Sequence, residues 1–281
     1  MDVYVKDGKL VSHDQLNLGY NSSFLYGINA FEGVAAYRDP KNKLVCFKLK
    51  SHMARLENSS KVLGLNYDEK EILKSIKLAL SVFASANHVY LRVILYEADS
   101  KTWARTDRSN ILVQAYEVDR PRNAVSCAVL DMMKGDAKVF PPEVKCGANY
   151  ANSRLGKLKA QHAGCDLPIY QDKEGCLTES GGAALILLAE NALWTYPWNG
   201  KILRSITVKS ILEHVDYRVH WKGFPAANLA SLTAACLVGT ALEVVPIKRI
   251  NTMSFPDYSN ALSDELYSAL HFAIREDQTI A

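Results

Sequence analysis

Short apolar runs separated by turn residues constrain the fold of this chain more than any other feature. Such runs, rich in β-branched and aromatic residues, are typical of strands. In the first part of the chain they are KLVCFKL (43–49), VYLRVILYEA (89–98) and NILVQAYEV (110–118). One segment between them has a helical period instead, which predicts an amphipathic helix over YDEKEILKSIKLALSVFASAN (67–87) with an apolar stripe of Ile72, Ile76, Leu80 and Phe83.

A turn-rich stretch, DRPRN at 119–123, interrupts this pattern, and Pro121 is a typical linker residue. We therefore predict an N-terminal α+β domain at 1–119, a linker at 120–124 and a C-terminal domain at 125–281. The second domain is predicted to contain strands in AVSCAVLDM (124–132), DLPIYQD (166–172), GGAALILLAE (181–190), ALWTYP (192–197) and EVVPIKRI (243–250). Its predicted helices are NSRLGKLKAQHAG (152–164), TVKSILEHV (207–215) and a final helix with Leu262, Leu266 and Leu270 on one face.

Charge and cysteine usage exclude several classes of partner. The 281 residues include 33 Lys and Arg against 30 Asp and Glu, a formal charge of +3 that does not favour nucleic acid or an anionic membrane. The chain has no apolar run that could cross a bilayer and no signal-peptide pattern at its start, so a cytoplasmic location is expected. The six cysteines lack metal-ligand spacing, so we expect reduced thiols and no metal site.

The stretch EVKCGANYANSRLGKLKAQHAG (143–164) places Lys145 in a loop of small residues between Pro141-Pro142 and a predicted helix. A lone lysine is usually a solvated surface charge. Loops of this kind also carry functional groups on a rigid frame. From these residues alone, Lys145 is either a surface charge or a nucleophile.

Six stretches resemble, in the same order, the branched-chain aminotransferases. They are YGINAFEGVAAY (26–37), HMARLENSSKVLG (52–64), YLR (90–92), VKCGANYANSRLGKLKAQHAGCD (144–166), TES (178–180) and VGTALEVVPI (238–247). That family belongs to the fold-type IV pyridoxal phosphate enzymes, with D-amino acid aminotransferase and aminodeoxychorismate lyase. The resemblance implies a two-domain α+β fold with a smaller N-terminal α/β domain, a larger C-terminal β-rich domain, a cofactor in the cleft and a homodimer.

The resemblance assigns the cofactor-binding residues by position. Lys145 matches the Schiff-base lysine, which also moves the proton during catalysis. Glu179 matches the carboxylate that pairs with the pyridine nitrogen, and Tyr150 matches the tyrosine that hydrogen-bonds the phenolic oxygen. Arg55 matches the phosphate-binding arginine, whose planar fork suits two parallel hydrogen bonds. The phosphate cup is completed by Ile206, Thr207 and Thr240.

The resemblance also implies a substrate side, formed by Tyr26, Phe31, Tyr90, Arg92, Thr240 and Ala241. Arg92 would pair with the α-carboxylate of the amino acid. Ordinary structural roles compete with these assignments: an outward strand arginine for Arg92, a buried core tyrosine for Tyr150, a solvated carboxylate for Glu179 and a helix cap for Thr207.

Several positions depart from the family pattern. Ala35 replaces a common arginine after FEG-x, and RSITV replaces PGITR. SGGAAL replaces the frequent G-x-G-E-N-L. The residues concerned are Ala35, Arg204, Ser205, Val208, Ala183 and Ala184. Loss of polar groups around a site can change its activity, so the cofactor is predicted more firmly than the substrate. Arg204 is expected either to serve an additional anionic group or to face solvent.

The leading hypothesis is a ping-pong transamination between an amino acid, branched-chain-like or a related specialised one, and a 2-oxo acid. A lyase, a racemase or another specialised biosynthetic enzyme with the same cofactor is the second hypothesis. The third is a binding protein that kept the fold and lost the reaction. Presence of Lys145, Glu179, Arg55 and Tyr150 together argues against the third. The sequence leaves the natural donor, acceptor, stereochemistry and pathway open.

Overall fold

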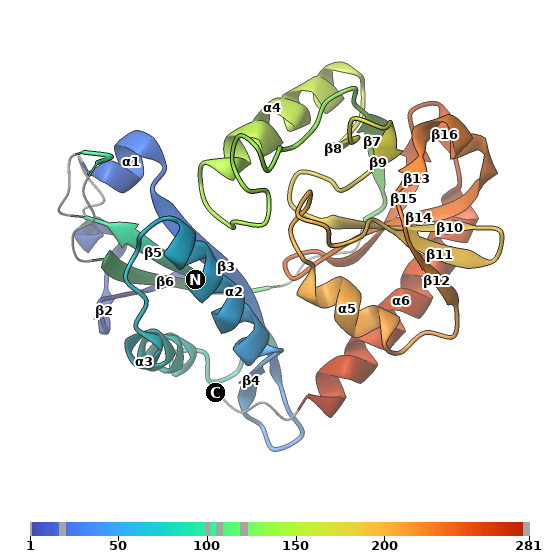
Figure 1. The fold of residues 1–281 in the computed structure, drawn as a ribbon. Helices are drawn as coiled ribbons and strands as arrows, with labels where there is room; N and C mark the ends of the chain where they lie inside the picture. Colours follow the sequence, from blue (N-terminus) through green and yellow to red (C-terminus); the bar gives the residue numbers. More distant parts are fainter. Residues whose placement is uncertain (1, 17–20, 99–101, 105–108, 119–122, 278–281) are drawn as a thin grey trace. The chain divides into compact units, whose positions relative to one another are not determined.

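The computed structural model of the chain divides into two compact units. It describes residues 2–16, 21–98, 102–104, 109–118 and 123–277 (Figure 1). The first unit takes in residues 1–120, 144–148 and 277–281, and the second takes in 121–143 and 149–276. Residues 119–122, which include Pro121 and much of the predicted linker, lie outside the described residues. The domain boundary at 120–124 therefore stays a prediction.

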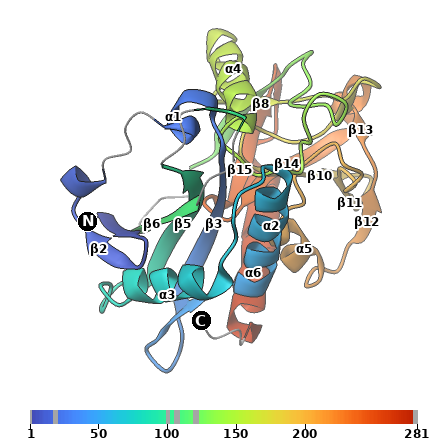
Figure 2. The ribbon, with the colours of Figure 1, turned by 60° about the vertical axis from the view of Figure 1, so that its left-hand side comes forward.

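The first unit is built on an antiparallel sheet of six strands in the order β2-β1-β6-β5-β3-β4. The strands are β1 (Asp2–Lys6), β2 (Lys9–Val11), β3 (Asn29–Arg38), β4 (Leu44–Cys46), β5 (His88–Glu97) and β6 (Ser109–Glu117). The short helix α1 (Ser22–Tyr26) precedes β3. Helices α2 (Leu49–Val62) and α3 (Glu69–Leu80) cover one face of the sheet (Figures 1 and 2). Alternate residues of β5, namely Val89, Leu91, Val93 and Leu95, form the core with these helices.

The predicted elements of this unit mostly exist, with corrected bounds. Strands β5 and β6 confirm two predictions, and the stripe Ile72, Ile76, Leu80 and Phe83 is buried as predicted. The predicted helix 67–87 is too long, because Asp68 caps its start by accepting a hydrogen bond from the Glu71 N–H at 3.1 Å and the helix ends at Leu80.

The predicted strand 43–49 is wrong in its second half. It ends at Cys46, and Leu49 already begins α2. Between them Lys48 has a φ of 50°, a left-handed conformation that ends the extended run and turns the chain into the helix. The Lys48 N–H donates to the Asp277 carboxylate at 2.6 Å, so a residue late in the chain fixes this turn.

The second unit has a mixed sheet in the order β12-β11-β10-β14-β15-β7-β8, with β16 paired to β15. Its strands are β7 (Val125–Val129), β8 (Leu167–Ile169), β10 (Ala184–Ala189), β11 (Ala192–Thr195), β12 (Arg218–Trp221), β14 (Leu232–Gly239), β15 (Glu243–Ile250) and β16 (Met253–Ser254); β9 (Cys176–Leu177) and β13 (Phe224–Pro225) form a separate pair. Helix α4 (Asn149–His162) packs on β7 and β8. Helix α6 (Pro256–Glu276) packs on β14, β15 and α5 (Ile206–Leu212) (Figure 1).

The predictions for this unit hold in type, and most differ in length. Strand β15 has the predicted bounds, and Leu262, Leu266 and Leu270 are buried in α6. Helix α4 begins at Asn149 and not at residue 152, so Tyr150 lies in its first turn. The central strand β14 was not predicted, because LTAACLVG carries no alternation and no flanking turn signal.

Three further properties bear on function. Within the described ranges no helix is both long and apolar enough to span a bilayer. All six cysteines are free thiols. Among the described residues, no cluster of three or more His, Cys, Asp or Glu side chains could hold a metal ion.

Candidate active site

Lys145 is held in the first unit by its backbone. Its carbonyl accepts a hydrogen bond from the Phe31 N–H at 3.0 Å, and its own N–H donates to the Ser59 hydroxyl at 3.0 Å. The next residue, Cys146, forms an antiparallel bridge with Ala30. The segment Val144–Ala148 thus lies along the edge of β3, and the Lys145 ammonium lies 4.9 Å from the centre of the Phe31 ring. Half-buried and fixed on both sides, Lys145 is unlike a solvated surface lysine.

Behind this strand lies a buried ionic cluster of Glu32, Arg55 and His52, which we call the Glu32 cluster. Arg55 donates through Nε to Glu32 Oε1 at 2.6 Å and through Nη2 to Oε2 at 2.9 Å. His52 Nδ1 lies 2.7 Å from the same Oε2. Glu32 is fully buried, and the Arg55 side chain is 15% exposed. The Nε–Nη2 edge of the arginine fork therefore meets a carboxylate of the protein itself.

The charge states of the Glu32 cluster follow from its surroundings. Burial opposes ionisation of Glu32, but the charge of Arg55 and hydrogen bonds from His52 and Arg55 outweigh it and lower the pKa to about 2. Burial lowers the pKa of His52, and the charges of Arg55 and Lys145 lower it further, against the opposing effect of Glu32. His52 is therefore neutral at pH 7. Because ionised Glu32 can only accept, Nδ1 of His52 carries the hydrogen.

Four of the predicted substrate residues lie in β3, in β5 and at the end of α1. In the sheet register Phe31 pairs with Ile94, and Gly33 pairs with Arg92, so these residues share the face opposite α2 and α3. Arg92 is exposed there. Tyr26 ends α1 and is 48% exposed.

Tyr90 lies across Gly33 on the same face. A Cβ at position 33 would come within 2.1 Å of the Tyr90 hydroxyl, so only glycine leaves room for this tyrosine. Tyr90 also packs against Tyr116 with 5.4 Å between ring centres. Position 33 therefore needs glycine because of the neighbouring strand.

In the second unit, Glu179 is the centre of a second cluster, the Glu179 cluster, with Lys134 and Tyr150. Lys134 Nζ lies 3.2 Å from Glu179 Oε1, and the two side chains are only 14% and 5% exposed. The same ammonium lies 5.9 Å from the centre of the Tyr150 ring. Glu179 is consequently not the solvated strand-end carboxylate that the sequence also allowed.

The backbone around Glu179 is fixed by Tyr170 and α4. The Tyr170 N–H donates to the Glu179 carbonyl at 3.0 Å, and its hydroxyl donates to the Asn152 carbonyl at 2.9 Å. Ser153 donates to the Gly181 carbonyl at 2.6 Å. Burial and the charge of Glu179 raise the pKa of Tyr170 to about 12, so the phenol stays protonated. These hydrogen bonds tie the backbone of residues 179–181 to Tyr170 and α4.

The predicted phosphate cup lies at two turns of the second unit. Ser205 caps α5 and accepts a hydrogen bond from the Val208 N–H at 3.2 Å, while Ile206 and Thr207 form the first turn. The first N–H groups of a helix have no acceptor within the helix. They can therefore donate to a bound anion. Thr240 and Ala241 lie in the turn between β14 and β15.

The departures from the family pattern are of three kinds in the structure, of which Ser205 is the cap of α5 described above. Ala35, Ala183, Ala184 and Val208 are buried apolar residues, between 1% and 9% exposed. Arg204 is 63% exposed and pairs with Glu143 through Nε at 2.8 Å. Of the two alternatives for Arg204, its exposure favours the one in which the side chain faces solvent.

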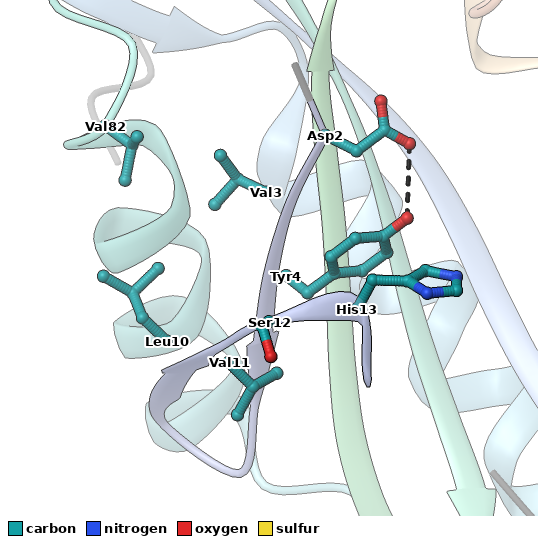
Figure 3. A pocket seen from close by; sticks show the side chains of 8 residues that line it. All are labelled: Asp2, Val3, Tyr4, Leu10, Val11, Ser12, His13 and Val82. Atoms are coloured by element: carbon teal, nitrogen blue, oxygen red, sulfur yellow. Dashed lines mark hydrogen bonds between the residues drawn. The ribbon is translucent and has the colours of Figure 1, made fainter. Parts of the chain in front are cut away.

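A separate hollow of about 450 Å³ lies beside β1 and β2 of the first unit (Figure 3). Leu10, Val11 and Val82 line it, and Tyr4 donates to Asp2 at its edge over 3.3 Å. None of the predicted site residues lines it. The hollow is therefore not part of the candidate active site.

Sequence reasoning missed Glu32, His52, Ser59 and Lys134. Glu32 had a usable signal, because a lone carboxylate in the apolar run AFEGVAA must be paired when the strand is buried. His52 and Arg55 are three residues apart and thus share a helix face, which made them candidate partners. Lys134 gave no such signal, since its loop has no regular period.

Comparison with known proteins identifies the family. The family Amino-transferase class IV matches residues 29–250, most of the chain. The chain belongs to the class IV aminotransferases. A probable branched-chain-amino-acid aminotransferase of Aquifex aeolicus is 26% identical over 264 residues, covering 89% of this chain and 85% of that protein.

Solved structures give the same fold for this class IV aminotransferase. The branched-chain aminotransferase of the archaeon Thermoproteus uzoniensis, crystallised with norvaline, is 25% identical with a TM-score of 0.84, covering 99% of this chain and 96% of that one. The branched-chain amino acid aminotransferase of Escherichia coli has a TM-score of 0.88 at 19% identity, covering 99% and 96%. The predicted α+β fold is confirmed.

Proposed function

We propose that this class IV aminotransferase exchanges the amino group of an aliphatic amino acid with a 2-oxo acid by a ping-pong mechanism. The observation that carries the proposal is Lys145, whose amine lies on the Phe31 ring while Phe31 and Ser59 fix its backbone. A primary amine held in this way suits covalent attachment to a carbonyl group. Norvaline in the Thermoproteus uzoniensis structure supports an aliphatic side chain.

The cofactor of this enzyme is pyridoxal 5′-phosphate, and the donor set of the chain fits it. Lys145 supplies the amine, and the Glu179 carboxylate suits a protonated ring nitrogen. Arg55 and the first turn of α5 supply donors for a phosphate. Because Glu32 occupies the Nε–Nη2 edge of Arg55, that edge is not where the phosphate binds. When bound, the cofactor acts as an electron sink for the α-carbon of the substrate.

The residues of the chain then have separate tasks. Lys145 would take the proton from the α-carbon of the amino acid and deliver it to the cofactor carbon, and would move it in the opposite direction when the 2-oxo acid is aminated. Tyr150 donates to, and so orients, the phenolic oxygen of the ring, while Glu179 keeps the ring nitrogen protonated. Ile206, Thr207 and Thr240 complete the phosphate cup.

The substrate side is proposed to consist of Tyr26, Phe31, Tyr90, Arg92, Thr240 and Ala241. Arg92 is exposed on the sheet face that also carries Phe31, where its guanidinium suits the α-carboxylate of an amino acid. The register supports a common face for the strand residues among them. A homodimer and a cytoplasmic location stay predictions from the sequence.

The test is an absorbance spectrum of the purified protein with pyridoxal 5′-phosphate, in the wild type and in Lys145→Ala. We expect a visible band that borohydride fixes covalently only when Lys145 is present. Adding an aliphatic L-amino acid should bleach the band, and a 2-oxo acid should restore it. Lys157→Ala, which changes another lysine of the same sequence stretch, is the matched control and should keep the band.

Each other outcome counts against the proposal. A protein without any band lacks the cofactor, which would leave a binding protein with this fold. A band that amino acids bleach, with ammonia released and no transfer to a 2-oxo acid, would identify a lyase. A band unchanged in Lys145→Ala would remove Lys145 from the reaction.

A further inference from the structure

Lys134 is a mostly buried cation that the reaction as described does not use. It lies in the loop after β7, and its carbonyl accepts a hydrogen bond from the Asn152 side chain at 2.9 Å, which ties the loop to α4. Its own side chain is 14% exposed and reaches Glu179 Oε1 at 3.2 Å. Burying an ammonium costs several kcal/mol unless a charge pairs with it. The Glu179 carboxylate is that partner.

The same ammonium also faces a second residue of the site. It lies 5.9 Å from the Tyr150 ring centre, within the range of a cation–π contact. Glu179 and Tyr150 come from different segments of the second unit, a loop after β9 and the first turn of α4. Lys134 contacts both, so one side chain links the two residues to which the proposed function gives the ring nitrogen and the phenolic oxygen.

We propose that Lys134 is a positioning residue that holds the Glu179 carboxylate and, through it, sets the acidity of the bound cofactor. This inference rests on the proposed function. A cation that shares the carboxylate leaves less negative charge for the ring nitrogen, so the ring keeps its proton less tightly than it would beside an unshared carboxylate. The protein thereby limits how strongly the cofactor withdraws electrons.

The groups around the carboxylate give this effect a definite sign. Lys134 is a cation that faces Glu179, and Tyr150 and Tyr170 are neighbouring phenols; burial and the charge of Glu179 raise the pKa of Tyr170. Removing the Lys134 ammonium makes the electrostatic potential around the poorly solvated Glu179 carboxylate more negative. Every proton held nearby then becomes harder to remove, so the pH titration of the cofactor's visible absorbance moves to higher pH.

The experiment uses the full chain loaded with pyridoxal 5′-phosphate and titrates that absorbance with pH in wild type, Lys134→Met and Lys134→Arg. We expect the midpoint of Lys134→Met to rise by about one pH unit, the size of an unscreened charge at short range. Lys134→Arg keeps the charge and should return the midpoint most of the way. With an amino acid, kcat of Lys134→Met should fall while KM changes little.

Lys138→Met is the matched control, because Lys138 is an exposed lysine of the same loop. Its midpoint should equal that of the wild type. To test whether Lys134 acts through Glu179, Lys134→Met is also made in a Glu179→Gln protein. There it should shift the titration midpoint by less than half as much as it does in the wild type. Thermal unfolding of each loaded variant separates loss of fold from loss of charge.

The result that overturns the inference is a midpoint that stays in place in Lys134→Met, or one that Lys134→Arg fails to restore. An equal shift in Lys138→Met would show a general charge effect and overturn it too. A full shift in the Glu179→Gln background would show that Lys134 acts on the cofactor directly, which contradicts action through the carboxylate. Failure of the proposed function is distinguishable: without the cofactor the wild type has no visible band to titrate, and a lyase has a band that a 2-oxo acid does not restore after an amino acid has bleached it.

Discussion

Arg55 makes two parallel hydrogen bonds to Glu32, of 2.6 Å from Nε and 2.9 Å from Nη2. Two parallel hydrogen bonds fix the plane of the guanidinium group. Because Glu32 is buried, water does not replace Arg55 as its partner. An arginine so held presents its remaining edge in a fixed direction before any ligand arrives. The conformational entropy of the Arg55 side chain is thus lost on folding and does not weaken ligand binding.

Glu32→Gln is expected to lower the free energy of unfolding by about 3 kcal/mol, because it removes the carboxylate charge that the mostly buried Arg55 faces. The affinity for pyridoxal 5′-phosphate should fall about tenfold or more as Arg55 loses its orientation. Urea unfolding and cofactor titration measure the two effects. Glu57→Gln, which breaks the exposed pair with Lys61 on the same helix, should cost less than about 1 kcal/mol. Equal effects of the two substitutions would contradict a special role for Glu32.

Stability should fall at acid pH in two stages. The pKa of His52 lies below its ordinary 6.5 in the folded chain, so below pH 6.5 the unfolded chain takes up a proton that the folded one does not, and stability falls as pH falls. Glu32 has a folded pKa of about 2 against an ordinary 4.5, so its contribution is complete above pH 4.5 and is lost towards pH 2.

Urea unfolding at a series of pH values measures both stages. His52→Gln should flatten the first stage, and Glu32→Gln should remove the second. His13→Gln, which changes a histidine with a 79% exposed side chain, should leave both stages in place. A wild-type curve that is flat below pH 6.5 would refute the assignment.

Gly33→Ala should destabilise the first unit by about 1–3 kcal/mol, since its Cβ would meet the Tyr90 hydroxyl at 2.1 Å. Tyr90→Leu removes the obstacle at its own cost. The double variant should lose less unfolding free energy than the two single variants lose together, by about 1 kcal/mol or more, as expected for residues in contact. Strict additivity in a double-mutant cycle would show that the ring moves aside freely.

Arg92→Met is expected to raise KM for the amino acid about tenfold or more and to leave the cofactor spectrum unchanged, because the proposed partner of Arg92 is the substrate carboxylate. Steady-state kinetics with an amino acid and with the corresponding amine, which lacks the carboxylate, measure this. The amine should not distinguish the variant from the wild type. Arg218→Met removes another exposed strand arginine and serves as the control. An unchanged KM in Arg92→Met would end its substrate role.

Sequence patterns predicted those parts of the fold that depend on local repetition. The stripe from Ile72 to Phe83 and the leucines of α6 repeat at helical spacing, so burial followed directly. Strand β14 and helix α2 were not predicted, and the strand predicted over 43–49 ran past the left-handed Lys48 into α2, since these limits depend on tertiary pairing and on the Lys48 turn.

The candidate site divides in the same way. Lys145, Arg55 and Glu179 were found by their motifs, and their roles stay proposals. Their partners Glu32 and Lys134 were not found, because ion pairs between side chains far apart in the sequence leave no periodic trace. A lone charge inside an apolar strand is the exception, as Glu32 shows, and it predicts that a partner exists without naming it.

The edge position of Val144–Ala148 on β3 has a consequence for the order in which the chain is made. The ribosome synthesises β3 and α2 well before the segment that carries Lys145. The hydrogen bond from the Lys48 N–H to Asp277 forms later still, once Asp277 has been synthesised. During synthesis the first unit therefore has an open strand edge and an unfinished turn. The nascent chain would acquire its reactive amine in place only after the whole first sheet has been made, and the turn into α2 would gain its Asp277 hydrogen bond only after the second unit has been made.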